Sequence, residues 1–128
     1  MRIILYLAVA GALGTLSRYG LSGLAQKITG AGFPYGTLII NVSGCLVIGY
    51  IMQVALNSDI IPATARVIAT LGFLGAFTTF STFSYETVRF LEAGEWLYAI
   101  LNIGLNVGVG LTATLLGTFI GRITLGGI

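Results

Sequence analysis

The sequence has no histidine, one cysteine and few charges, which make up only 8% of its 128 residues. Without histidine, no side chain titrates near neutrality unless its pKa is strongly perturbed. The single cysteine, Cys45, excludes an intrachain disulfide and a cysteine-rich metal site, and we expect it to serve packing. The chain also lacks an evident nucleophile–base pair, so we predict that it is not an enzyme.

Apolar residues dominate the composition. They make up 56% of the chain, and the mean hydropathy is +1.00. A water-soluble domain of this size would not leave so little charged surface, so the composition indicates an integral membrane protein. Nineteen glycines suit helices that approach each other closely. The net charge of +2 is too small and too scattered to suggest nucleic-acid binding.

Four apolar runs are long enough to cross the hydrocarbon core of a bilayer. They cover about residues 3–24, 35–56, 66–91 and 96–120. The first run superficially resembles a signal peptide, but it continues to Ala25 without a clear small-residue cleavage site, so we expect it to be retained. The sequence thus predicts an all-α membrane protein with a single four-span domain over residues 1–128.

The segment Leu71–Glu86 differs from the rest of these runs. Phe77, Phe80 and Phe83 recur at every third position, and hydroxyl side chains fill the gaps: Thr78, Thr79, Ser81, Thr82 and Ser84. Hydroxyls and glycines at membrane depth indicate a third helix that is broken near its middle. A backbone group freed there must be satisfied by protein, ion or water, and broken helices often mark ion or substrate sites. The alternative is that the hydroxyls bond back to the helix and the rings pack on a neighbour.

Polar residues elsewhere admit two interpretations each. Arg18 is either an interfacial anchor or a cation that attracts anions into a vestibule. Asn41 either joins helices or presents its amide N–H groups to an anion. Glu86 is either an interfacial charge or a salt-bridge or vestibule residue. Four small or polar residues of the fourth run form either a helix–helix seam or one wall of a polar path: Asn102, Asn106, Gly110 and Thr114.

Cations are divided evenly between the two sides of the predicted bundle. Three fall on each side: Arg2, Arg66 and Arg122 with the termini, and Lys27, Arg89 and, by depth, Arg18 opposite them. The positive-inside rule then gives no orientation. A chain without this bias can insert both ways, so we expect two opposed copies to pair as an antiparallel, dual-topology homodimer. Four short helices enclose little interior, and a conduction path would need both copies.

Three motifs resemble those of the Fluc (CrcB) family of fluoride ion channels. They are residues 77–84 (FTTFSTFS) with Gly75 before and Glu86 after, residues 36–41, and Gly14 with Arg18. The first is the most specific, because it is long and unusual. The likeness covers nearly the whole chain in length and span count.

The resemblance implies a passive channel that exports fluoride down its own gradient, with two pores in each antiparallel homodimer, in the inner membrane of a bacterium. It assigns Phe80, Phe83 and Asn41 to the fluoride pathway, with Asn41 reaching across to the partner's rings. Ring edges carry partial positive charge, so rings three residues apart could meet an anion edge-on. Further candidate pathway residues carry hydroxyl, amide or cationic groups: Thr79, Ser81, Thr82, Arg18, Asn102, Asn106 and Thr114.

A broken helix also suggests a cation site. Carbonyl oxygens freed at Gly75 and Thr78 of two opposed copies would place four oxygens about the twofold axis, and oxygen ligands suit a hard cation. The resemblance implies that this cation is a structural sodium ion.

A second hypothesis is a proton-coupled cation antiporter of the small multidrug-resistance type, which also has four spans and dual topology. Such a protein needs a membrane-embedded carboxylate. Residues 1–58 contain no Asp or Glu, and Asp59 lies in a connection, so a proton relay lacks parts. A purely structural membrane subunit leaves the Phe and Thr tract unexplained.

Overall fold

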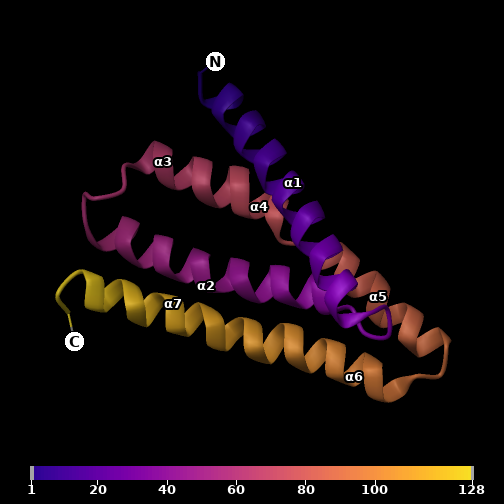
Figure 1. Ribbon diagram of the computed structural model, residues 1–128. Coiled ribbons are helices and arrows are strands. Elements are labelled where there is room, and N and C mark those ends of the chain that lie inside the picture. Colours follow the sequence, from indigo (N-terminus) through magenta and orange to yellow (C-terminus); the bar gives the residue numbers. More distant parts are fainter. Residues whose placement is uncertain (1, 128) are drawn as a thin grey trace.

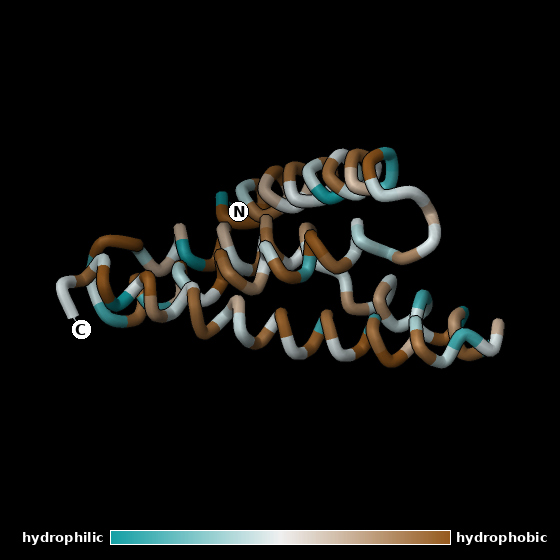
Figure 2. The backbone as a smooth tube through the Cα atoms, turned by 60° about the horizontal axis from the view of Figure 1, so that its bottom comes forward, coloured by the Kyte–Doolittle hydropathy of each residue, from teal (hydrophilic) through white to brown (hydrophobic). Residues whose placement is uncertain are grey.

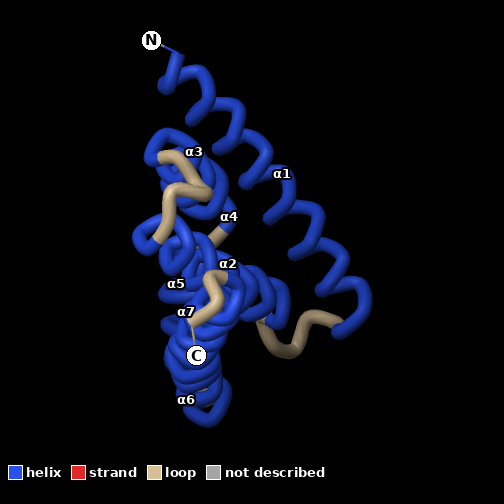
Figure 3. The backbone as a smooth tube through the Cα atoms, turned by 90° about the vertical axis from the view of Figure 1, so that its left-hand side faces the viewer, coloured by secondary structure: helices blue, strands red, loops and turns tan. Residues whose placement is uncertain are grey.

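The computed structural model describes residues 2–127, which form four long helical spans joined by short loops (Figure 1). The spans are Arg2–Thr29, Tyr35–Asn57, Ala63–Glu92 and Trp96–Thr124, and each is long and apolar enough to cross a membrane. No strand is present in the described residues (Figure 3). The prediction of an all-helical chain with four spans is confirmed.

Two of the spans are single helices and two are composite. The first and second are α1 (Arg2–Thr29) and α2 (Tyr35–Asn57). The third consists of α3 (Ala63–Val67), the π-helical segment η1 (Ile68–Leu74), α4 (Gly75–Phe77) and α5 (Phe80–Glu92). The fourth consists of α6 (Trp96–Gly104), the π-helical segment η2 (Leu105–Val109) and α7 (Gly110–Thr124).

The first and last helices extend beyond the apolar runs that predict them. Helix α1 continues to Thr29 and ends at Gly30, whose φ of +79° belongs to the left-handed region. The Thr29 hydroxyl donates to the Ala25 carbonyl in this last turn. Hydropathy marks where a chain leaves the hydrocarbon, whereas a helix continues until its backbone is capped, so the two boundaries differ.

The third span is interrupted between α4 and α5. Thr78 (φ −80°, ψ 159°) and Thr79 (φ −150°, ψ 105°) have extended backbone angles. Thr79 is the N-cap of α5, and its hydroxyl oxygen accepts from the Thr82 amide at 3.3 Å. The predicted break near the middle of this span is therefore observed, and it lies inside the Phe and Thr tract.

The four spans pack in two pairs that meet near this break. Helix α2 lies along η2 and α7, and α1 crosses η1 and α4 (Figures 1 and 3). Helix α5 packs against α6 beyond the break. The central cluster of buried apolar side chains is small and consists of Ile40, Leu74 and Phe77.

Glycines let the backbones touch where spans cross. A Cβ at Gly117 of α7 would lie 2.1 Å from the Leu46 carbonyl oxygen of α2, and one at Gly14 of α1 would lie 2.3 Å from the Phe73 carbonyl oxygen. No side chain fits at either position without moving a backbone.

Most apolar side chains face outward. Leu5, Tyr19 and Leu115 are each more than 60% exposed, and apolar residues occur along the whole length of every span (Figure 2). An apolar exterior of this extent is unfavourable in water and suits lipid.

Candidate functional site

The side chain of Asn41 holds the break in the third span. The Thr79 amide donates to Asn41 Oδ1 at 2.9 Å, and Asn41 Nδ2 donates to the Thr79 carbonyl at 3.2 Å. In a continuous helix the Thr79 amide would instead donate to the carbonyl of Gly75. One side chain of α2 therefore replaces the helical partner of the interrupted backbone.

Carbonyl oxygens around the break lose their helical donors, among them those of Gly75 and Thr78. The Thr79 amide, which would have paired with Gly75, donates to Asn41. The Thr82 amide, which would have paired with Thr78, donates to the Thr79 hydroxyl. Freed carbonyls at membrane depth need another partner, and their oxygens are ligands for hard cations. The carbonyl oxygens of Gly75 and Thr78 are therefore of the ligand type that a hard cation, such as sodium, takes.

Asparagines of three elements form a continuous cluster beside the break. Asn41 Nδ2 also donates to Asn106 Oδ1 at 3.0 Å, and Asn106 Nδ2 donates to Asn102 Oδ1 at 3.0 Å. Asn102 is fully buried, and its Nδ2 donates to the Thr87 hydroxyl oxygen at 3.0 Å. The structure brings these three predicted residues together.

Thr114 lies apart from this cluster. Its hydroxyl donates to the Gly110 carbonyl of its own helix at 3.2 Å. It lines a separate cavity of about 310 Å³ with Gln53 and Asn57, near the other end of α2. Gly110 packs near Cys45, whose Sγ would lie 3.5 Å from a Cβ at that position. The fourth span thus combines a polar cluster with a helix–helix seam.

The rings of Phe80 and Phe83 are tilted against each other next to the same cluster. Their centroids are 5.6 Å apart and their planes are inclined by 58°. Phe83 is 8% exposed and Phe80 is 78% exposed. Both line a cavity of about 360 Å³ together with Asn41, Gly75 and Thr78. The open ring of Phe80 leaves one side of this cavity without a protein wall in the described residues.

The remaining predicted residues lie on other faces. Arg18 is half-buried and lines a cavity of about 750 Å³ with Lys27, Thr79 and Thr82. Thr82 accepts a hydrogen bond from the Thr79 hydroxyl at 2.8 Å. Ser81 is exposed in the first turn of α5.

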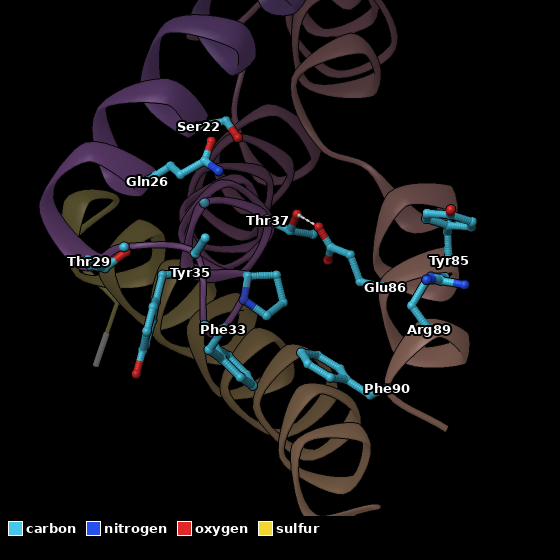
Figure 4. A pocket seen from close by; sticks show the side chains of 15 residues that line it. Ser22, Gln26, Thr29, Phe33, Tyr35, Thr37, Tyr85, Glu86, Arg89 and Phe90 are labelled. Carbon is cyan, nitrogen blue, oxygen red and sulfur yellow. Dashed lines mark hydrogen bonds between the residues drawn. The ribbon is translucent and has the colours of Figure 1, made fainter. Parts of the chain in front are cut away.

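One polar pair was missed from the sequence. The Thr37 hydroxyl donates to Glu86 Oε1 at 2.6 Å in a cavity of about 320 Å³ (Figure 4). Glu86 Oε2 is buried and has no hydrogen-bond partner among residues 2–127. The single ion pair of these residues joins Arg89 and Glu92, so Glu86 is not in a salt bridge. Thr37 lies four residues before Asn41, and this spacing places both on one face of α2.

These features define a class: a small four-span membrane protein in which amides, hydroxyls and rings surround a helix broken at membrane depth. The sequence model of the family described as "CrcB-like protein, Camphor Resistance (CrcB)" matches residues 5–118. The chain belongs to this family, and the resemblance found in the motifs is confirmed.

Relatives match over nearly their whole length. The "Fluoride-specific ion channel FluC" of Citrifermentans bemidjiense is 48% identical over 95% of this chain and 98% of its own. The protein of the same name in Dehalococcoides mccartyi is 48% identical over 94% and 92%, and that of Syntrophotalea carbinolica is 50% identical over 93% and 97%. The family is one of passive channels, so the prediction of a non-enzyme is confirmed, and the chain is a multi-pass membrane protein.

Proposed function

We propose that the chain is a fluoride-selective channel through which the ion passes down its own gradient. The observation that carries the proposal is the Asn41–Thr79 pair, which holds a broken span beside Phe80 and Phe83. Fluoride holds its water tightly, and a pore must replace that shell with donors while binding weakly enough for release. Relatives of 48–50% identity carry the name of fluoride-specific channels.

The assembly that we propose is an antiparallel homodimer with two pores, in the inner membrane of a bacterium. Two observations support it. The cavity beside the break has an open side, with Phe80 78% exposed. The even division of the cations removes the preference for one orientation. A second copy inserted in the opposite sense would cover the open side and complete the wall of each pore.

The proposed path uses ring edges, hydroxyls and one amide. Edges of Phe80 and Phe83 meet the anion, and the hydroxyls of Ser81 and Thr82 are further donors. Both N–H groups of Asn41 have acceptors in this structure, and its bond to the Thr79 carbonyl is the longer one at 3.2 Å. An anion would therefore exchange with that carbonyl.

The outer part of the proposed path is cationic. Arg18 and Lys27 share the 750 Å³ cavity, where their positive charges would attract anions into a vestibule. Thr114 is left out of the path, because its hydroxyl bonds to its own helix in a separate cavity.

A structural sodium ion is expected to stabilise the dimer at the freed carbonyls of Gly75 and Thr78. Two antiparallel copies supply four such oxygens. Ligand binding to the folded state alone adds about 2.7 kcal/mol at a concentration 100 times the dissociation constant. Thermal unfolding of the purified protein should therefore occur at a higher temperature in sodium chloride than in N-methylglucamine chloride. Equal midpoints in the two buffers would contradict the sodium site.

The test of the channel is ion-specific efflux. Purified protein in liposomes loaded with fluoride or chloride is expected to release fluoride rapidly and chloride at the rate of protein-free liposomes. Equal release of both anions would contradict fluoride selectivity, and release of neither would contradict a channel.

One observation is a reason to test the antiporter hypothesis together with the channel. Glu86 of the third span is a carboxylate with one buried oxygen, and proton-coupled antiport requires a carboxylate within a span. Liposomes with an imposed proton gradient and a cationic dye distinguish the two. Proton-driven dye transport without fluoride efflux would replace the channel by the antiporter.

A further inference from the structure

A single directional chain of hydrogen bonds begins and ends on the polypeptide around α5. The Thr79 amide donates to Asn41, which donates to Asn106, which donates to Asn102. Asn102 donates to the Thr87 hydroxyl oxygen, and that hydroxyl donates to the Phe83 carbonyl at 2.8 Å. The chain thus links the interrupted backbone to the main chain of the second ring residue.

The two ends fix the direction of every amide between them. The Thr79 amide only donates, so the oxygen of Asn41 must face it. The Phe83 carbonyl only accepts, so the Thr87 hydroxyl donates its hydrogen to that carbonyl. The hydroxyl oxygen is then left as an acceptor, and Asn102 must present its NH₂ group to it. Reversing Asn41 would turn its oxygen toward the acceptors that its NH₂ group now contacts.

Two of the three inner members, Asn102 and Thr87, are sealed from any ion, whereas Asn106 lines the cavity of about 360 Å³ but has no free N–H to offer. Asn102 is 0% exposed, Thr87 is 7% exposed, and both nitrogen hydrogens of Asn106 go to Asn102, one to its side chain and one to its carbonyl. Buried amides of this kind are fully satisfied by protein and polarise one another along the chain.

We infer that Thr87, Asn102 and Asn106 are positioning residues for Asn41. This inference rests on the proposed fluoride channel. The bond to Asn106 holds one N–H of Asn41 in place, and the other N–H is the one that exchanges the Thr79 carbonyl for an anion. The chain of hydrogen bonds keeps the NH₂ group of Asn41, rather than its oxygen, toward the cavity. At its other end it holds the backbone of Phe83, whose ring lines the same cavity.

The test removes the hydroxyl of Thr87, which touches neither the cavity nor the proposed ion. In planar bilayers, the unitary fluoride current of Thr87→Val is expected to be about tenfold smaller, a factor that corresponds to ~1.4 kcal/mol. Thr87→Ser retains the hydroxyl and should restore most of the current. Thr118→Val is the matched control, because its hydroxyl makes the same bond to its own helix, at 3.0 Å to the Thr114 carbonyl, outside the chain of amides.

Unitary current separates positioning from folding, since a folding defect reduces the number of channels and leaves each one unchanged. Equal unitary currents in Thr87→Val and wild type would overturn the inference, as would an equal loss in Thr118→Val or in Thr87→Ser. Thr87→Ala removes the same hydroxyl with less bulk. Failure of both Thr87→Val and Thr87→Ala to fold would show that the chain of hydrogen bonds serves only folding, and would also overturn the inference. A wild-type protein without fluoride current would instead reject the proposed function itself.

Discussion

Replacement of Phe83 by isoleucine is expected to reduce fluoride efflux from liposomes to the leak of protein-free vesicles. Isoleucine keeps an apolar side chain at this 8% exposed position but has no ring edge with partial positive charge. Phe80→Ile should have the same effect, because the two rings lie 5.6 Å apart at one cavity. Efflux is measured with a fluoride electrode after a potassium ionophore is added to discharge the membrane potential.

The control for this pair is Phe119→Ile. Phe119 is 53% exposed on α7, so this variant, like Phe80→Ile, exchanges an outward ring for isoleucine. It is expected to retain the wild-type efflux rate. All three variants should elute from size exclusion in detergent as the wild type does. Undiminished flux in both Phe80→Ile and Phe83→Ile would reject coordination by ring edges.

Replacement of Gly117 by alanine is expected to destabilise the whole fold. The added Cβ would lie 2.1 Å from the Leu46 carbonyl oxygen and 2.9 Å from the Tyr50 nitrogen, and both are backbone atoms of α2. The two helices must separate along their main contact. Overpacking of this kind costs about 1–3 kcal/mol, and more where backbone must move. A lowered thermal midpoint and aggregation in detergent are the expected results.

The matched variant is Gly104→Ala. A Cβ at Gly104, which ends α6, would meet no atom within 4 Å among residues 2–127 outside its own helical turn. Alanine favours a helix by ~1 kcal/mol relative to glycine, so this variant should be as stable as the wild type or more so. A thermal midpoint for Gly117→Ala equal to that of Gly104→Ala would contradict the close contact of α2 with α7.

The architecture is largely predictable from the sequence, because the bilayer imposes it. Hydrocarbon thickness sets the length of each span, and the hydroxyl tract of Leu71–Glu86 marks the break that the structure has at Thr78 and Thr79. The ends of α1 and α7 were not predictable, because Gln26, Lys27 and Thr124 continue a helix without being apolar.

The site is only partly predictable, for a different physical reason. Periodicity shows which residues share one helix face, and it places Asn102 one turn from Asn106. It does not show which faces of separate helices meet. The contacts of Asn41 with Thr79 and Asn106 join residues 38 and 65 positions apart. Thr87 and Thr37 look like ordinary helix hydroxyls until their partners, Asn102 and Glu86, are brought beside them.

The pairing of Asn41 with Thr79 also limits where residues can be inserted or deleted between these two positions of the sequence. One residue inserted into an α-helix rotates everything after it by about 100°. An insertion between Asn41 and the end of α2, or between the start of α3 and Thr79, would swing one partner away from the other. The loop at residues 58–62 is thus the stretch between them where changes in length are expected to be tolerated.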